Sequence, residues 1–313
     1  MLNYAVRRLL MTIPTFLIVA AMVFTLIRLV PGDPAAVMVG DLDDPTVLAE
    51  VREQLGLDEP LPLQFGMWLQ GVLQGELGTS LMTGEDVLDA MLRRFGVTGQ
   101  IVAISIFLAM LVAVPVGLLA AWKQNGRADL ATMTLVILGV SVPSFWVGIL
   151  LILVFGVELG WLPTIGYVSI GDDFGQGIRY LILPVAALLL TEMASLARMM
   201  RSSTIEVLRL EYITHARAKG LPERTVLWRH ALPNAFAPVL TVLGLMLGSL
   251  LGGAVVIETV FTLPGLGRFL VDGIYARDYP VVQGTLLLVA GIYVITNLVV
   301  DLLYPIFDPR VRL

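Results

Sequence analysis

The stretch FGVTGQIVAISIFLAMLVAVPVGLLAAW, residues 95–122, contains no charged side chain. A helix that crosses ~30 Å of hydrocarbon needs roughly 20 apolar residues, so this stretch is long enough to span a membrane. Five comparable runs occur elsewhere, of which only the last is interrupted by a charge, that of Glu192: residues 9–27, 130–157, 231–257, 279–300 and 180–197. Strands of a β-barrel would alternate in units of ~10 residues instead. The sequence therefore predicts an all-α integral membrane protein with six transmembrane helices.

The overall composition agrees with this class of protein. Of all residues, 57% are hydrophobic and only 14% are charged. The basic start MLNYAVRRLL precedes an apolar run that is longer than a signal-peptide core, which indicates a retained helix. The absence of cysteine excludes disulfides and thiolate metal sites.

The distribution of basic residues predicts the orientation in the membrane. With the N-terminus in the cytoplasm, segments 1–8, 123–129, 198–230 and 304–313 lie inside and carry 13 of the 20 lysines and arginines. Because positive residues near spans tend to remain in the cytoplasm, both termini are expected there.

We expect a single membrane domain over residues 1–313. Residues 31–94 are acidic and should form a small periplasmic cap, with one helix from Asp44 or Thr46 to about Leu55 and a second over 63–73. The predicted spans are 9–30, 95–122, 130–157, 180–199, 234–257 and 279–303. Segment 200–233 is then a cytoplasmic loop, and 258–278 is a periplasmic loop.

Residue patterns for catalysis or nucleotide binding are missing from the sequence. There are two lysines and no Gly-Lys dipeptide, so no phosphate-binding P-loop can form. The two histidines, His215 and His230, lack metal-site spacing, and there is no Gly-x-Ser-x-Gly motif. Energy must come from an ion gradient or from another polypeptide.

The cytoplasmic loop contains the basic stretch THARAKGLPERTVLWRHALPNA, residues 214–235. Apolar or small residues recur every three to four positions from Ser202 to Lys219, which predicts a helix, and Gly220 can end it in a left-handed conformation. Pro222 suits the first turn of a second helix, and Pro233 should end that helix. We call residues 200–233 the bracket. The residues at its bend should be small and surrounded by charged side chains. The residues expected to contact another protein are Ala216, Arg217, Lys219, Gly220, Leu221 and Arg224.

This stretch resembles the Glu-Ala-Ala loop of binding-protein-dependent ABC importer permeases. In that loop, Glu-Ala-Ala is followed by three residues, Gly, nine residues, Ile, one residue and Leu-Pro. The matching residues are Ala216, Gly220, Leu232 and Pro233, whereas Thr214, His215 and His230 depart from it. YITHARAKGL is similar to the variant of the dipeptide/oligopeptide/nickel subfamily. RLVPGDPA, RSSTIEVLRLEYI, VVIETVFTLPGLGRFLVDGI and DLLYPIFDPRVRL resemble the same subfamily in the same order.

The resemblance implies a permease with the type I ABC importer fold in a bacterial or archaeal cytoplasmic membrane. Its partners would be a second permease, two ATPases that bind ATP and magnesium, a periplasmic or lipoprotein binding protein, and membrane lipid, with no nucleic acid. The chain itself would have no cofactor. The bracket would be the coupling helix, and the leading substrate class is di- or oligopeptides, with nickel chelates, glutathione and oligosaccharides as alternatives.

Two further features suggest sites. A proline and two glycines interrupt the apolar stretch after the fifth span, so a loop that contacts the binding protein or closes over substrate is expected, with Glu258, Phe261, Pro264, Gly265, Leu266 and Gly267. Glu192 is costly in lipid and is expected to face the pathway or another chain. An ion-coupled carrier that uses Glu192 or Asp301 is the alternative function, and a membrane enzyme is a second alternative without a visible catalytic group.

Overall fold

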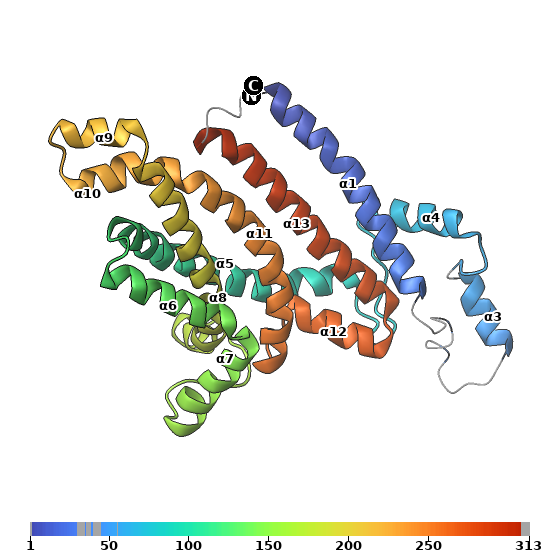
Figure 1. Ribbon diagram of the computed structural model, residues 1–313. Helices are drawn as coiled ribbons and strands as arrows, with labels where there is room; N and C mark the ends of the chain where they lie inside the picture. The colour runs from blue at the N-terminus through green and yellow to red at the C-terminus, as the bar shows by residue number, and fades with distance from the viewer. Residues whose placement is uncertain (1, 30–34, 36–38, 40–44, 55, 308–313) are drawn as a thin grey trace.

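The computed structural model describes residues 2–29, 35, 39, 45–54 and 56–307, and this part of the chain is almost entirely helical (Figure 1). The α-helices are α1 Leu2–Leu29, α3 Pro45–Gln54, α4 Leu61–Gln74, α5 Val87–Trp122, α6 Arg127–Ser141, α7 Ser144–Leu151, α8 Phe174–Leu208, α9 Glu211–Ala218, α10 Glu223–Thr225, α11 Leu232–Val260, α12 Leu266–Ala276 and α13 Tyr279–Phe307. Two π-helical segments continue α7 and α10, namely η1 Ile152–Glu158 and η2 Val226–Ala231.

Long apolar helices dominate the fold. Five of them, within the described residues, are long and apolar enough to cross a membrane, and α6 with α7 and η1 forms a bent pair that would be a sixth span. Large apolar side chains on α6 are open to the surroundings, for example Leu130 at 71% and Leu135 at 68% exposure. Such exposure suits lipid or a neighbouring subunit rather than water. The expected all-α, multi-span membrane fold is confirmed.

The third predicted span, 130–157, is broken in its middle. α6 ends at Ser141, α7 starts at Ser144, and the two parts meet at an angle of 95°. Val142 is extended, with φ −105° and ψ 125°, directly before Pro143. A proline ring disfavours the α conformation of the residue before it, which accounts for a break at this point rather than a kink.

Two other spans belong to helices that extend well past the apolar stretch. α5 starts at Val87 rather than 95, because the Asp86 carboxylate accepts a hydrogen bond from the Asp89 amide at 2.9 Å. α8 starts after Asp173, which caps the Gln176 amide at 3.0 Å, and it continues to Leu208. Capping side chains satisfy the free amides of a helix start. These helices therefore start at their capping residues and not at the edge of the apolar run.

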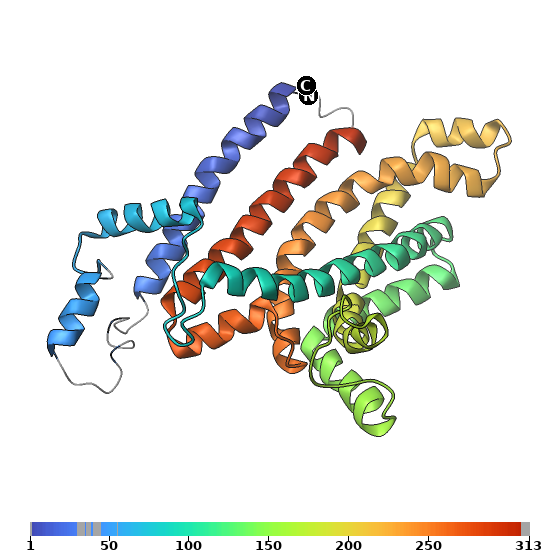
Figure 2. The same cartoon turned by 180° about the vertical axis from the view of Figure 1, so that it is seen from behind.

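Small residues allow the spans to pack closely. A Cβ added at Gly117 of α5 would lie 2.7 Å from Cβ of Met200 on α8, and one at Gly248 of α11 would lie 2.4 Å from the Tyr293 ring on α13. Close backbone approach at small residues is typical of helix packing in membranes. α1, α13 and α11 run side by side in both views (Figures 1 and 2).

Two ion pairs join helices near the same end of the bundle. Arg201 on α8 donates from Nε and Nη2 to the two Asp129 oxygens on α6, at 2.5 and 2.7 Å, and Asp129 is only 4% exposed. Arg8 on α1 meets Asp301 on α13 at 2.8 Å. Arg201 thus clamps α6 to α8, whereas its sequence position suggests a solvated loop charge.

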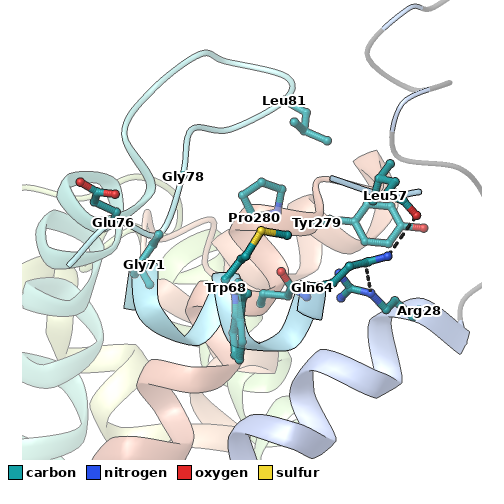
Figure 3. Close-up of a pocket in the computed structure, with 13 residues that line it drawn as sticks. Arg28, Leu57, Gln64, Trp68, Gly71, Glu76, Gly78, Leu81, Tyr279 and Pro280 are labelled. Atoms are coloured by element: carbon teal, nitrogen blue, oxygen red, sulfur yellow. Dashed lines mark hydrogen bonds between the residues drawn. The ribbon is translucent and has the colours of Figure 1, made fainter. Parts of the chain in front are cut away.

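The region between α1 and α5 is tied to the bundle through α4. Arg28, at the end of α1, donates to Oε1 of Gln64 from Nε and Nη2 at 3.1 and 2.8 Å, and the Gln64 amide donates to the backbone oxygens of Leu57 and Glu59. Figure 3 shows Arg28, Leu57 and Gln64 at a cavity of about 470 Å³, which Tyr279 of α13 also lines. α3 and α4 occupy the two segments where the sequence predicts helices.

Candidate functional site

The bracket consists of two helical arms. The first arm is α9, and the second arm is α10 together with η2. α8 ends at Leu208, and α9 starts at Glu211 after an extended Leu210, so the predicted single helix over 202–219 is divided. An acidic residue in the first turn stabilises a helix start, and Glu211 occupies that position in α9. In Figure 1 the two arms protrude at the end of the bundle where α1 starts and α13 ends.

Gly220 forms the tip between the arms. Its φ of +76° is left-handed, and the Gly220 amide donates to the Arg217 carbonyl at 2.9 Å while the Leu221 amide donates to that of Ala216 at 3.4 Å. Glycine adopts this conformation without steric cost, so it ends α9 here. No atom beyond its own neighbours lies within 4 Å of where a Cβ would be, so the tip is open to an approaching surface.

The floor of the bracket is apolar. Ile213, Val226 and Ala231 are completely buried, and Ala216 is only 6% exposed in the same cluster. Ala216 was expected on the outer bend, but the helical phase of α9 directs it inward. Its small size therefore lets the two arms approach each other, and Gly220 alone keeps the open position at the tip.

The second arm continues into α11 without a break. Residues 223–260 form one helical run, with the π-helical segment η2 just before Pro233. Pro233 was expected to end this arm. Because a proline ring clashes with the carbonyl four residues earlier in a regular helix, the wider π turn before it accommodates the ring. The arm is thus rigidly connected to a membrane span.

Polar contacts fix one arm against the other. Arg217 donates to the Glu223 carboxylate at 2.7 and 3.2 Å, in a half-exposed pair worth at most about 1 kcal/mol. The Asn234 amide donates to the Tyr212 hydroxyl at 2.9 Å, and that hydroxyl donates to the His230 carbonyl at 3.2 Å. Burial raises the pKa of Tyr212 above its ordinary value, which keeps the hydroxyl protonated as a donor.

The outward surface of the bracket combines charge with an aromatic ring. Of the expected docking residues, Arg217, Lys219, Gly220 and Arg224 are exposed, Leu221 is half-buried and Ala216 is buried. Trp228 is 48% exposed on the second arm. Sequence reasoning missed Trp228, although a tryptophan in a basic loop is a signal, because this residue is enriched at interfaces between proteins.

The other end of α11 holds a buried carboxylate. Glu258 is 0% exposed; its Oε1 accepts from the Thr98 hydroxyl at 2.5 Å and its Oε2 from the Arg268 amide at 2.9 Å. The Gly267 amide also donates to this carboxylate, and the Leu266 amide donates to the Thr98 hydroxyl at 2.8 Å. A negative group at a helix start is stabilised by the free amides and the helix dipole. Glu258 therefore caps α12 and, through Thr98, ties it to α5.

The α11–α12 corner, residues 258–267, differs from the predicted loop. Leu266 and Gly267 form the first turn of α12, and all the expected contact residues except Pro264 are buried in the chain. Capping by Glu258 is the physical reason, since it supplies acceptors where proline and glycine interrupt the previous helix. A Cβ on Gly267 would lie 2.5 Å from Cα of Val255, so glycine permits this close approach. Among the expected contact residues, Pro264 alone is exposed.

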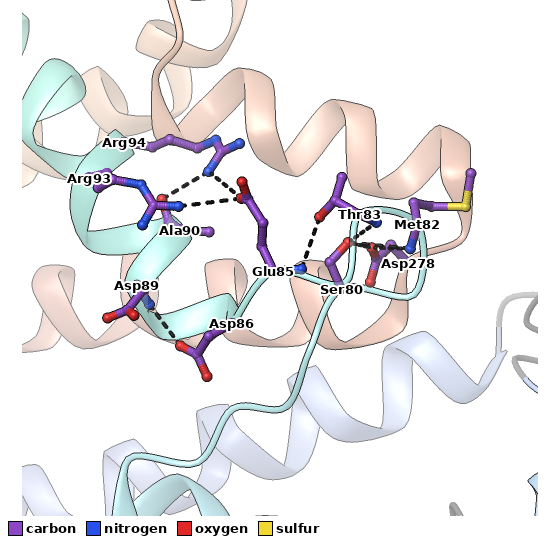
Figure 4. Close-up of polar contacts among 10 residues, drawn as sticks. All are labelled: Ser80, Met82, Thr83, Glu85, Asp86, Asp89, Ala90, Arg93, Arg94 and Asp278. Carbon is purple, nitrogen blue, oxygen red and sulfur yellow. Dashed lines mark hydrogen bonds and ion pairs between the residues drawn. The ribbon is translucent and has the colours of Figure 1, made fainter.

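A second buried carboxylate holds the chain before α5 against the start of α13. Asp278 is 2% exposed; its Oδ2 accepts from the Ser80 hydroxyl at 2.5 Å, and its Oδ1 accepts from the Val281 amide at 3.4 Å. The Thr83 amide in turn donates to the Ser80 oxygen at 3.0 Å (Figure 4). The contact between Ser80 and Asp278 had no sequence signal, because the two residues are 198 positions apart in the chain.

Comparison with known proteins identifies the class. Residues 113–313 match the family described as the binding-protein-dependent transport system inner membrane component, and residues 1–102 match the N-terminal family of such membrane components. The chain therefore belongs to the family of binding-protein-dependent transport system inner membrane components. It is a multi-pass transport component of the inner membrane and not an enzyme, which decides against both the carrier and the enzyme alternatives.

Similar proteins cover the whole chain. A probable peptide ABC transporter permease protein of Sinorhizobium fredii is 43% identical over 309 residues, or 99% of each chain. The dipeptide transport system permease protein of Alkalihalophilus pseudofirmus is 41% identical over 332 residues, covering both chains completely. A glutathione transport system permease protein of Salmonella choleraesuis is 44% identical over all of this chain and 99% of its own length. These similarities confirm the resemblance to the dipeptide and oligopeptide subfamily.

We predict that Glu258→Gln lowers the stability of the folded chain. An amide has one acceptor oxygen where the carboxylate has two, so a buried α12 amide loses its partner, at a cost of about 2–4 kcal/mol. The midpoint of thermal unfolding in detergent measures this change. Asp272→Asn is the matched control, because it removes a carboxylate of α12 that is 67% exposed. Equal midpoints for both variants would contradict a structural role for the Glu258 cap.

Proposed function

We propose that the chain is one permease subunit of an ATP-driven peptide importer, and that it forms half of the pathway together with a second, homologous permease. Two ATPases that bind ATP and magnesium drive transport, and an extracytoplasmic binding protein delivers a di- or oligopeptide. The names of the relatives, which include peptide, dipeptide and glutathione permeases, support this substrate class.

The observation that carries the proposal is the open tip of the bracket. Gly220 stands free at the end of two arms with an apolar floor, and the second arm is continuous with α11. A push on the tip is therefore transmitted to a membrane span as a rigid-body movement. A sequence without a P-loop needs such a contact, because the energy must come from another chain.

The orientation of the chain in the membrane is the remaining part of this proposal. The bracket and both termini lie in the cytoplasm, and the α11–α12 corner lies outside, where Pro264 is exposed to the binding protein. The excess of basic residues in the segments near the bracket supports this orientation. Glu192 is proposed to line the pathway.

The ATPase requirement tests the function directly. The purified chain alone should hydrolyse no ATP, whereas the assembly with its ATPases and second permease in lipid should hydrolyse it, faster when loaded binding protein is added. Phosphate release measures both states. Hydrolysis by the single chain at a rate similar to that of the assembly would overturn the proposal.

The orientation is tested with single cysteines, since the native chain has none. A membrane-impermeant thiol reagent added to intact cells should label Asp272→Cys and leave Arg224→Cys unlabelled until the membrane is permeabilised. Both side chains are exposed in the chain, so access depends on the membrane side alone in cells that express the chain without its ATPases and binding protein. The reverse labelling pattern would show that the proposed orientation is inverted.

The docking role of the tip is tested at Gly220. Gly220→Val should abolish co-purification of the ATPases, because it adds bulk at the contact and places a β-branched residue at positive φ. Gly220→Asn adds bulk but tolerates this φ, so it separates the two effects. We expect it to weaken ATPase binding at least tenfold while thermal stability stays close to that of the native chain. If Gly220→Asn bound the ATPases as the native chain does, the tip would not be the close contact.

A further inference from the structure

A second cavity lies within the spans, between α8, α11 and the end of α6. Its volume is about 440 Å³, and its lining residues are Val140, Thr191, Glu192, Ser195, Arg198, Val242, Leu245, Met246 and Ser249. The polar members come mainly from one stripe of α8, since positions 191, 195 and 198 recur at helical spacing. An open cavity with opposite charges at two points is unusual in a membrane-spanning helix.

Neither charge is neutralised inside the chain. Among the described residues, no ion pair involves Glu192 or Arg198, whereas Asp129 and Asp301 are both paired with arginines. The contact of the Glu192 carboxyl is with the neutral Ser249 side chain. A carboxylate held in a span without a charged partner is costly, so a partner of Glu192 outside the chain is expected. Arg198 is exposed at the end of the same span and can make a second contact with such a partner.

The spacing of the two positions along α8 suits a short peptide. Six residues separate Glu192 from Arg198, which is about 9 Å along the helix axis. An extended chain covers roughly 3.3–3.6 Å per residue, so the charged ends of a di- or tripeptide lie about 7–10 Å apart. We infer that this cavity is a pathway subsite that holds a peptide by its two ends, with the ammonium at Glu192 and the carboxylate at Arg198.

This inference rests on the proposed function and adds the site and the recognised groups. Ionic contacts to both termini are independent of the side chains of the peptide, and apart from the hydroxyls of Thr191, Ser195 and Ser249 the remaining walls are apolar. Such a subsite accepts many sequences while requiring free ends. Selection among peptides is thereby left to the binding protein.

The experiment compares transport with hydrolysis in proteoliposomes that contain the complete assembly and saturating binding protein. Uptake of labelled dialanine and trialanine per ATP hydrolysed should fall about tenfold in Glu192→Gln and Arg198→Gln, because each loses a charge-assisted hydrogen bond. Glu192→Asp and Arg198→Lys should retain most of the uptake. Glu206→Gln, which removes an exposed charge of α8 outside the cavity, should behave as the native chain does.

The possible outcomes distinguish a failure of the peptide subsite from a failure of the proposed importer function. Native uptake together with unchanged uptake in both glutamine variants would overturn the subsite and leave the importer intact. Uptake that falls only in proportion to ATP hydrolysis, or permease subunits that separate on purification, would also overturn it, since coupling or assembly would then be at fault. If the native assembly hydrolysed ATP but imported neither peptide, the proposed peptide function would fail.

Discussion

The Glu258 carboxylate is the interaction on which one end of the bundle depends. It replaces the hydrogen bonds that the backbone loses between α11 and α12, and it does so in a fully buried position where no water can help. Through Thr98 the same group reaches α5, so three helices meet at one charge. A membrane protein must satisfy its backbone internally wherever a helix stops, and a buried acid at the start of the next helix meets this need.

The two ends of α11 are therefore built by different means. At the bracket, contacts are local in the chain: Arg217 pairs with Glu223, and Asn234 reaches Tyr212. At the corner, the partner of Glu258 is 160 residues away. A locally held bracket can form around its own apolar floor and move as a unit with α11, whereas the corner fixes the far end of the same helix against its neighbours. One stiff helix thus joins the exposed bracket to an anchored end.

Sequence reasoning found the parts of this arrangement that depend on composition and short-range pattern. Apolar runs located the spans, and the Gly220 spacing located the tip, since both are properties of neighbouring residues. It failed where the cause is tertiary. Ala216 was placed outward because the floor beneath α9 was unknown. The start of α5 was missed for a local reason instead, since the Asp86 cap lies before the edge of the apolar run. The cap made by Glu258 could not be foreseen without Thr98.

Charged residues in the spans form a series that singles out one location. Asp129 and Asp301 are neutralised by arginines, and Glu258 is neutralised by amides and a hydroxyl. Each of these acids stabilises contacts between helices of the same chain. Glu192 has no such compensation within the described residues and faces a cavity together with Arg198. Since a span tolerates a charge only when something compensates it, this exception is the reason that we propose the cavity at Glu192 as the place where a transported molecule supplies the compensation.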